Sequence, residues 1–228
     1  MDGREKKDKK IVPVNSAVVP EGMDEEDNLA EVLDDATEYG DDVSVHFFKD
    51  CIVADREIDC ISFEKILFDH CSFENVDFDG CSFDNVIFKN CSFVKCSFSG
   101  GIFSRCEFSG SKCIGGDFTS ASFIDLTIKN SSFRYANFTS SRFDRVCIKS
   151  CDMRGAFLAR CSLKNTLFSE TDFTEGEFFQ TSLSGMDLTS CKIFGVRFSD
   201  GAPEIKGATV DMYQAADLAR LLGVKIKE

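Results

Sequence analysis

An apolar residue returns at every fifth position from Phe48 to Phe198, and this period is never interrupted. It recurs 31 times, and 20 of these positions are Phe. Two residues before each of them usually stands a small or compact residue, such as Cys71, Ala121 or Gly176. A period of five matches neither the roughly 3.6 residues of a helical turn nor the alternation of a strand, so neither element could keep one face buried over this length. The chain must therefore fold into a repeating coil.

Each five-residue unit can form one short side of such a coil. The repeated apolar residue and the residue two positions earlier then both point inward, as alternate residues of an extended segment do. Four units close a square, so that residues twenty positions apart stack on one another. Phe48, Phe68, Phe88 and Phe108 form one such ladder of like side chains. The period predicts an all-β solenoid over residues 43–200.

Units such as Cys71–Asn75, Cys81–Asn85 and Ala136–Ser140 resemble the pentapeptide repeat family. The resemblance covers about two thirds of the chain, and it implies a right-handed quadrilateral β-helix with four units in each coil. The open ends of a solenoid must be covered. The expected fold is thus an all-β, right-handed quadrilateral β-helix with a capped N-terminus and a short C-terminal α-helix.

The N-terminal part differs from the repeats. Residues 1–42 hold 14 acidic and five basic residues, a composition that predicts a largely disordered tail. Within this tail four apolar residues fall at helical spacing, and they could form a helix that covers the first coil. These residues are Leu29, Val32, Leu33 and Ala36.

The C-terminal part, residues 201–228, also departs from the repeats. Pro203 takes the next repeat position, where we expect the β-helix to stop. Asp211 can cap a helix together with Gln214 three residues later, and Gly223 can end this helix. Apolar residues after Gly223 alternate with lysines, as in a short edge strand.

Residues 207–224 resemble the C-terminal dimerisation segment of the quinolone-resistance branch of the family, the Qnr-like and MfpA-like proteins. The resemblance implies a homodimer held by one side of the helix, whose residues are Met212, Ala215, Leu218, Leu221 and Leu222. A hydrophobic lid on a monomer is the alternative, because any solenoid end must be covered. That branch binds DNA gyrase and topoisomerase IV as a mimic of duplex DNA and protects them from fluoroquinolones. The resemblance therefore implies a type II topoisomerase as partner and no direct binding of nucleic acid.

The charge pattern supports this mimicry only in part. The formal net charge is −13, but most of the acidic excess lies in residues 1–42. Six acidic residues follow consecutive repeat positions and predict an acidic band around the rod, a candidate partner-binding surface: Asp59, Glu64, Asp69, Glu74, Asp79 and Asp84. Ordinary solvated turns would explain the same residues equally well. Farther along, Lys129, Lys149, Arg134 and Arg154 form a basic patch.

Enzymatic catalysis is the function class that the sequence supports least. The two histidines, His46 and His70, have no nucleophile motif, glycine-rich phosphate loop or metal-ligand cluster beside them. We therefore expect no catalytic residue, no cofactor and no metal. Nine of the twelve cysteines occupy the inward position two before the repeat residue, which indicates packing and not disulfides.

The compartment and the partner follow from weaker signals. No apolar run approaches the roughly 20 residues of a membrane span, and the charged N-terminus does not resemble a signal peptide, so we expect a cytoplasmic protein.

Many Qnr-like proteins carry loops that contribute to gyrase protection, whereas no loop interrupts the repeats here. A structural scaffold with an unknown protein partner is therefore the alternative function.

Overall fold

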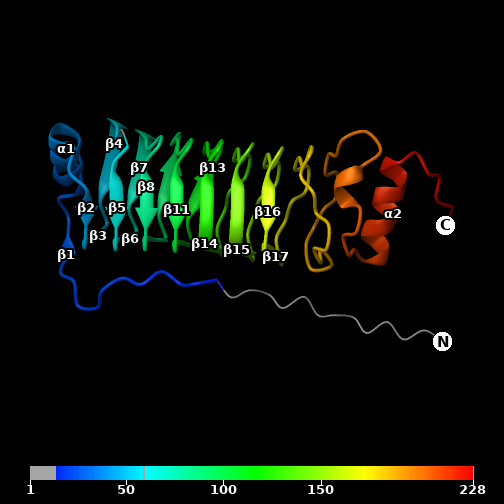
Figure 1. Cartoon of the computed structure of the whole chain (residues 1–228), viewed down its shortest axis with the longest axis horizontal. Helices are drawn as coiled ribbons and strands as arrows, with labels where there is room; N and C mark the ends of the chain where they lie inside the picture. Colours follow the sequence, from blue (N-terminus) through cyan, green and yellow to red (C-terminus); the bar gives the residue numbers. More distant parts are fainter. Residues whose placement is uncertain (1–13, 59, 228) are drawn as a thin grey trace.

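The computed structural model describes residues 14–58 and 60–227, which form a rod of stacked coils with a helix at each end (Figure 1). Strands of successive coils pair in parallel all along the rod. This arrangement confirms the predicted all-β β-helix with a capped N-terminus and a short C-terminal helix. The part of the predicted tail at 1–13, and Asp59 of the acidic band, lie outside the described residues.

The described part of the chain contains many short strands and few helices. In chain order they are β1 (Glu25–Glu26), α1 (Leu29–Tyr39), β2 (Val43–Ser44), β3 (Phe47–Lys49), β4 (Ile52–Glu57), β5 (Ser62–Glu64), β6 (Leu67–Asp69), β7 (Ser72–Asp77), β8 (Ser82–Asp84), β9 (Ile87–Lys89), β10 (Ser92–Val94), β11 (Ile102–Ser104), β12 (Glu107–Ser109), β13 (Lys112–Ile114), β14 (Ser122–Lys129), β15 (Arg142–Lys149), β16 (Ser162–Lys164), β17 (Leu167–Ser169), the 3-10 helix η1 (Pro203–Ile205) and α2 (Met212–Leu221).

The strands form two sheets that wrap around the rod. The larger sheet has the order β1-β3-β6-β9-β12-β14-β11-β8-β5-β2, and β15 extends it by pairing with β14, β16 and β17. The smaller sheet has the order β13-β10-β7-β4. From β2 onward the paired residues are twenty positions apart, as Phe48 and Phe68 are. The offset is the one that the five-residue period predicts for four units per coil.

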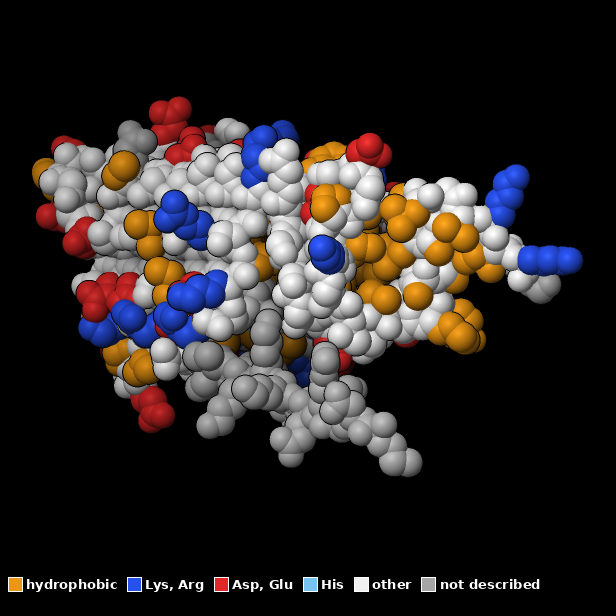
Figure 2. All heavy atoms as spheres, turned by 45° about the vertical axis from the view of Figure 1, so that its right-hand side comes forward, with side chains coloured by type: hydrophobic (Ala, Val, Ile, Leu, Met, Phe, Trp, Pro, Cys, Tyr) orange, Lys and Arg blue, Asp and Glu red, His pale blue; other side chains and the backbone are white. Residues whose placement is uncertain are grey.

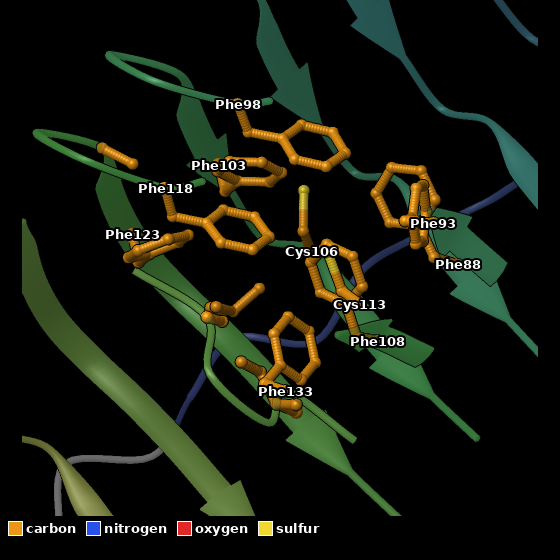
Figure 3. Packing of buried hydrophobic residues seen from close by; sticks show 14 of the residues in the cluster. Phe88, Phe93, Phe98, Phe103, Cys106, Phe108, Cys113, Phe118, Phe123 and Phe133 are labelled. Atoms are coloured by element: carbon orange, nitrogen blue, oxygen red, sulfur yellow. The ribbon is translucent and has the colours of Figure 1, made fainter. Parts of the chain in front are cut away.

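The repeated apolar residues fill the inside of the rod. Phe78, Phe98 and Phe118 stack with ring centroids 5.0 Å apart and an interplanar angle of 4°. Neighbouring columns meet edge to face, as Phe73 and Phe78 do at 5.7 Å and 73°. Figure 3 shows how rings from successive coils fill the core around the thiol of Cys106. Each such aromatic pair adds about 0.5–1.5 kcal/mol beyond the burial of its apolar area.

Where the inward residue two positions earlier is Cys, Ser or Thr, its side chain usually donates a hydrogen bond to the preceding coil. The Cys106 thiol donates to the carbonyl of Phe83 at 3.3 Å, and the Ser111 hydroxyl donates to the carbonyl of Phe88 at 2.9 Å. All twelve cysteines are free. Burial raises the pKa of Cys106, and likewise that of Cys81, to about 12. These thiols are therefore protonated at neutral pH.

Most sides of the coils end at a corner with left-handed backbone. The corner residue stands two positions after the repeat residue, as Asn75, Asn85 and Asn90 do with φ of 53°, 55° and 54°. Asn and Gly tolerate this conformation better than other residues. This preference explains why polar and glycine residues recur at the corners.

Helix α1 covers the first coil. Its residues Leu29, Leu33 and Ala36 are buried and belong to the same core as the phenylalanines. Arg56 occupies the inward position two residues before the repeat residue Ile58. Its Nε–H donates a hydrogen bond to the carboxylate of Asp34 in the helix at 2.6 Å. The helix thus closes the core and also provides a counter-ion for the irregular first coil.

The segment before α1 lies along the rod, although its acidic composition predicts disorder. β1 pairs with β3, and residues 14–20 then continue along the rod (Figure 1). The N–H of Val18 donates to Oδ1 of Asn85 at 3.1 Å, and the N–H of Asn15 donates to Oδ1 of Asp125 at 3.2 Å. Composition cannot reveal such bonds, because the backbone amide of almost any residue can form them.

The β-helix does not stop at Pro203, contrary to the prediction. The N–H of Leu183 donates to the carbonyl of Glu204, and the N–H of Leu188 donates to the carbonyl of Thr209. The acceptor is 21 positions ahead in both bonds, instead of 19 as in the regular coils. Two extra residues are therefore accommodated around η1, where a proline at the first position needs no N–H donor. The last coil continues to Thr209.

Helix α2 begins as predicted. The Asp211 carboxylate accepts from the N–H of Gln214 at 2.8 Å, and the Gln214 side chain accepts from the N–H of Asp211 at 2.9 Å. The predicted edge strand is absent, since residues 224–227 have no regular structure. At this end of the rod, Gln214 of α2 bonds the carbonyls of Leu188 and Cys191.

We expect Phe103→Asp to lower the free energy of unfolding by more than about 4 kcal/mol, because it removes a core ring and buries a carboxylate. Its neighbour Ile102 is 47% exposed and lies between Ser82 and Ser122 of the adjacent coils, so Ile102→Asp should cost about 1 kcal/mol or less. Chemical denaturation of both variants measures the difference. Equal losses would contradict the inward register.

Thiol labelling in native buffer should proceed in a defined order. Cys60 is exposed and should react first, and Cys147 is half-buried with its pKa raised by burial, so it should follow more slowly. The other ten thiols should react only after unfolding. Mass spectrometry after brief labelling tests this, with Cys60→Ser as the control that removes the fast site. Rapid labelling of Cys106 would contradict the burial of the inward column.

Candidate protein-interaction surfaces

The described members of the acidic band lie on the outside of the first coils. They follow one another at intervals of five, so they pass around the four sides of the rod instead of lining one side. Glu64 and Asp84 lie side by side on β5 and β8. Glu74 is exposed, and no ion pair forms to it within residues 14–58 and 60–227. The band is therefore a ring and not an acidic stripe along the axis.

Asp69 is buried in an ionic cluster. Lys89 Nζ donates to its carboxylate at 2.8 Å, and His70 Nδ1 lies 2.7 Å away. Burial disfavours the charged form, but the hydrogen bonds and charges of Lys89 and His70 together outweigh it and hold the pKa of Asp69 below its usual value. This carboxylate is neutralised by the rod itself.

Three further members of the band are also engaged. Asp84 forms an ion pair with Arg105, and Glu64 forms one with Lys65. Asp79 accepts a hydrogen bond at 2.8 Å from a backbone N–H of the next coil. The band therefore presents carboxylates and bases together to any partner.

A twenty-residue offset between acids and bases is the signal that the sequence analysis missed. Five pairs show it: Asp69 with Lys89, Asp125 with Arg145, Asp144 with Lys164, Asp172 with Lys192 and Glu177 with Arg197. Because residues twenty apart are neighbours on adjacent strands, such pairs can be found from the period alone. The predicted basic patch is compensated too, since Lys129 lies 2.8 Å from Glu107 and Arg154 lies 2.6 Å from Asp152.

Asp125 is buried although it occupies an outward corner. Arg145 donates Nε to Oδ1 at 2.8 Å and Nη2 to Oδ2 at 2.9 Å, and the backbone of Asn15 adds a third donor. The hydrogen bonds from Arg145 outweigh the burial, and together with the Asn15 amide they lower the pKa of Asp125 to about 2. The N-terminal segment thus covers a charged and fully bonded corner.

The predicted dimer side of α2 divides into a buried and an exposed part. Leu218 packs on the core at 7% exposure. Gln214 donates its side-chain amide to the carbonyls of Leu188 and Cys191 at 2.9 and 2.7 Å. The other four predicted residues are exposed: Met212, Ala215, Leu221 and Leu222. α2 is therefore a lid on the last coil that also carries a free apolar side.

The C-terminal part of the chain also exposes apolar residues that the sequence analysis did not assign. Tyr213, Phe194, Val224 and Ile226 are all exposed. Hydrophobic side chains gather at the C-terminal end of the rod in Figure 2. Exposed apolar patches of this kind commonly mark protein contacts. Tyr213 escaped notice because it lies off the predicted helix side, and Phe194 because it follows an inward repeat residue.

Among the described residues, no group of three or more His, Cys, Asp or Glu side chains is arranged to hold a metal ion. Likewise, no helix in this part of the chain has the length and apolarity to cross a membrane. Both histidines contact carboxylates, His46 with Glu26 at 2.8 Å and His70 with Asp69.

Comparison with known proteins identifies the repeats. A family model of pentapeptide repeats in nine copies matches residues 59–112, and a second model of eight copies matches residues 102–139 and 121–158. No functionally curated protein matches the chain.

Several solved structures are distantly similar to this chain. Trypsin-treated QnrB1, a plasmid-mediated fluoroquinolone resistance protein, is 20% identical over 79% of this chain and 100% of its own, with a TM-score of 0.44. Full-length QnrB1 is 20% identical over 88% of this chain and 95% of its own, with a TM-score of 0.40. HetL of the cyanobacterium Nostoc, involved in heterocyst differentiation regulation, is 8% identical over 77% and 92%, with a TM-score of 0.30. Likenesses this distant do not extend to function.

We expect Asp125→Asn to lower the free energy of unfolding at neutral pH by about 2 kcal/mol, from the fall of the pKa from 3.8 to about 2. Because the folded pKa is depressed, this contribution is complete above pH 3.8 and disappears as the pH falls through about 2. Denaturation of both proteins across this range measures it. Asp200→Asn, at an exposed turn, is the control. A difference that stays constant down to pH 2 would contradict a role for the charge.

Proposed function

The repeat region of this chain belongs to the pentapeptide repeats, and we propose that the chain is a non-enzymatic, protein-binding rod that forms a homodimer through α2. The exposed apolar side of α2 carries this proposal. Met212, Leu221 and Leu222 are 77%, 54% and 54% exposed, and covering apolar area is worth about 25 cal/mol per Å². A two-fold arrangement brings the same surface of both copies together.

Within this role, we propose that the partner is a type II topoisomerase, either gyrase or topoisomerase IV. The support is the resemblance of residues 207–224 to the quinolone-resistance branch, together with the net charge of −13. In this proposal the rod occupies the DNA-binding surface of the enzyme as an acidic mimic and protects it from fluoroquinolones. Glu64 and Glu74 are the band members whose carboxylates are most available to a partner.

A scaffold rod with a different protein partner is the second candidate, and the compensated charges favour it. Duplex DNA presents one negative charge about every 1.7 Å along its axis, whereas Lys65, Lys89 and Arg105 lie among the carboxylates of the band. Both candidates act in the cytoplasm. The twelve free cysteines support that compartment, because thiols stay reduced there.

A gyrase supercoiling assay with and without ciprofloxacin separates the two candidates. The topoisomerase proposal expects inhibition of supercoiling or protection from the drug at micromolar protein. Glu64→Lys with Glu74→Lys should weaken the effect about tenfold, from about 0.7 kcal/mol for each exposed charge. The effect should shrink as salt rises, because the contacts are solvent-exposed.

Glu175→Lys is the matched control for these reversals, because Glu175 is an exposed carboxylate on the distant half of the rod. It should leave the effect on gyrase unchanged. A wild-type protein that neither inhibits nor protects gyrase and topoisomerase IV rules out the topoisomerase partner and leaves the scaffold role.

Dimerisation is tested separately by light scattering. Leu221→Glu with Leu222→Glu places two charges on the apolar side of α2 while Leu218 still covers the core, so the measured mass should halve. Lys206→Glu, an exposed substitution outside α2, should keep the dimer. A wild-type mass equal to one chain would show that α2 is only a lid.

A further inference from the structure

The N-terminal residues 14–27, named the strap from here on, lie along the rod as a bound extended peptide would (Figure 1). β1 pairs with β3 at one end of the strap. Farther along, Val18 and Asn15 donate their backbone N–H groups to the side chains of Asn85 and Asp125. The strap therefore uses backbone donors, and the rod supplies side-chain acceptors.

The spacing of the two acceptors matches that of an extended chain. Asn85 and Asp125 are separated by two coils, which is about 10 Å at ~4.8 Å between neighbouring strands. The three residues from Asn15 to Val18 also span about 10 Å when extended at ~3.3 Å per residue. An extended peptide along this edge can therefore place backbone amides that are three residues apart opposite corner residues that are two coils apart.

Both acceptors are held in position by the rod. Arg145 bonds both oxygens of Asp125, and the amide nitrogen of Asn85 donates to Asp84 at 3.2 Å, which orients Oδ1 of Asn85 toward the strap. Under the strap, Asn85 and Asp125 are only 8% and 4% exposed. Arg105 occupies the corner between them. We name this edge, formed by Asn85, Arg105, Asp125 and Arg145, the Asx edge.

The strap also shows which side chains the edge accepts. Its half-buried apolar residues are Val14, Ala17, Val19 and Met23. Toward its C-terminal end, Glu25 lies 2.9 Å from Lys49 and Glu26 lies 2.8 Å from His46. The surface under the strap is therefore complementary to an extended segment with small apolar side chains followed by carboxylates.

We propose that the Asx edge is a binding site for an extended segment of a protein partner, apolar and then acidic, and that the strap occupies this site as an intramolecular competitor. A partner binds here by displacing the strap, so that its apolar part replaces the region of Asn15 and Val18 and its acidic part replaces Glu25 and Glu26. Because the strap belongs to the same chain, its effective concentration at the edge is high, and it sets the affinity that a partner must exceed. The proposal does not depend on the dimer or on a topoisomerase partner.

The test uses the full-length protein and a fluorescent synthetic peptide with the sequence of residues 14–27. Asn15→Pro with Val18→Pro removes both N–H donors of the strap and leaves the acceptors of the rod intact. We expect this double variant to bind the peptide at least tenfold more tightly than the wild type in an anisotropy titration. Ser16→Pro with Glu21→Pro is the matched control, because both residues are exposed and neither amide bonds an acceptor among the described residues, and it should bind like the wild type.

A second pair of substitutions locates the binding. Asn85→Ala in the Asn15→Pro, Val18→Pro protein should remove the gain. Asn90→Ala should keep it, since Asn90 is an asparagine at an equivalent left-handed corner away from the strap. The proposal is overturned if the proline double variant binds the peptide no more tightly than the wild type, or if the gain survives Asn85→Ala.

Discussion

The stacking of like side chains twenty positions apart is the interaction on which the rest of this structure depends. Phe78, Phe98 and Phe118 lie almost face to face, and this contact is possible only if the inward positions of successive coils stay in register. A shift of one residue in any coil would move a polar residue into the core and a ring into water. The uninterrupted period of the sequence is therefore a packing requirement.

The same register organises the outside of the rod. A carboxylate of one coil meets a base at the same place on the next, as Asp125 meets Arg145. The strap obeys the register as well, because its amides reach corners two coils apart. The charged and polar side chains on the surface of this fold thus form ladders along the rod. A substitution in such a ladder changes contacts in two neighbouring coils at once. A function proposed for the rod must be read from these ladders and not from single residues.

The fold was predictable from the sequence because one period determines both the inward positions and the neighbours of each strand. The helix that begins at Asp211 was predictable from its capping residues. The continuation of the last coil past Pro203 was not, because two extra residues around η1 preserve the ladder without following the period. The acidic band was identified as a set of charges without its bases: Lys89 could have been paired with Asp69 from the twenty-residue offset, whereas Arg105 lies 21 positions from Asp84 and could not. The docking of the strap has no side-chain signature, since it relies on backbone amides.

The two capping helices, α1 and α2, limit the length of the rod. Each coil edge is complementary to the edge of a similar coil, so an uncovered end could template the end of another copy, and repeated addition of this kind produces an open filament. Gln214 satisfies two carbonyls of the last regular coil with its own amide, and α1 places Leu29 and Leu33 where a further coil would stack. The two helices therefore block the end-to-end addition of further copies, and they keep the rod at a finite size.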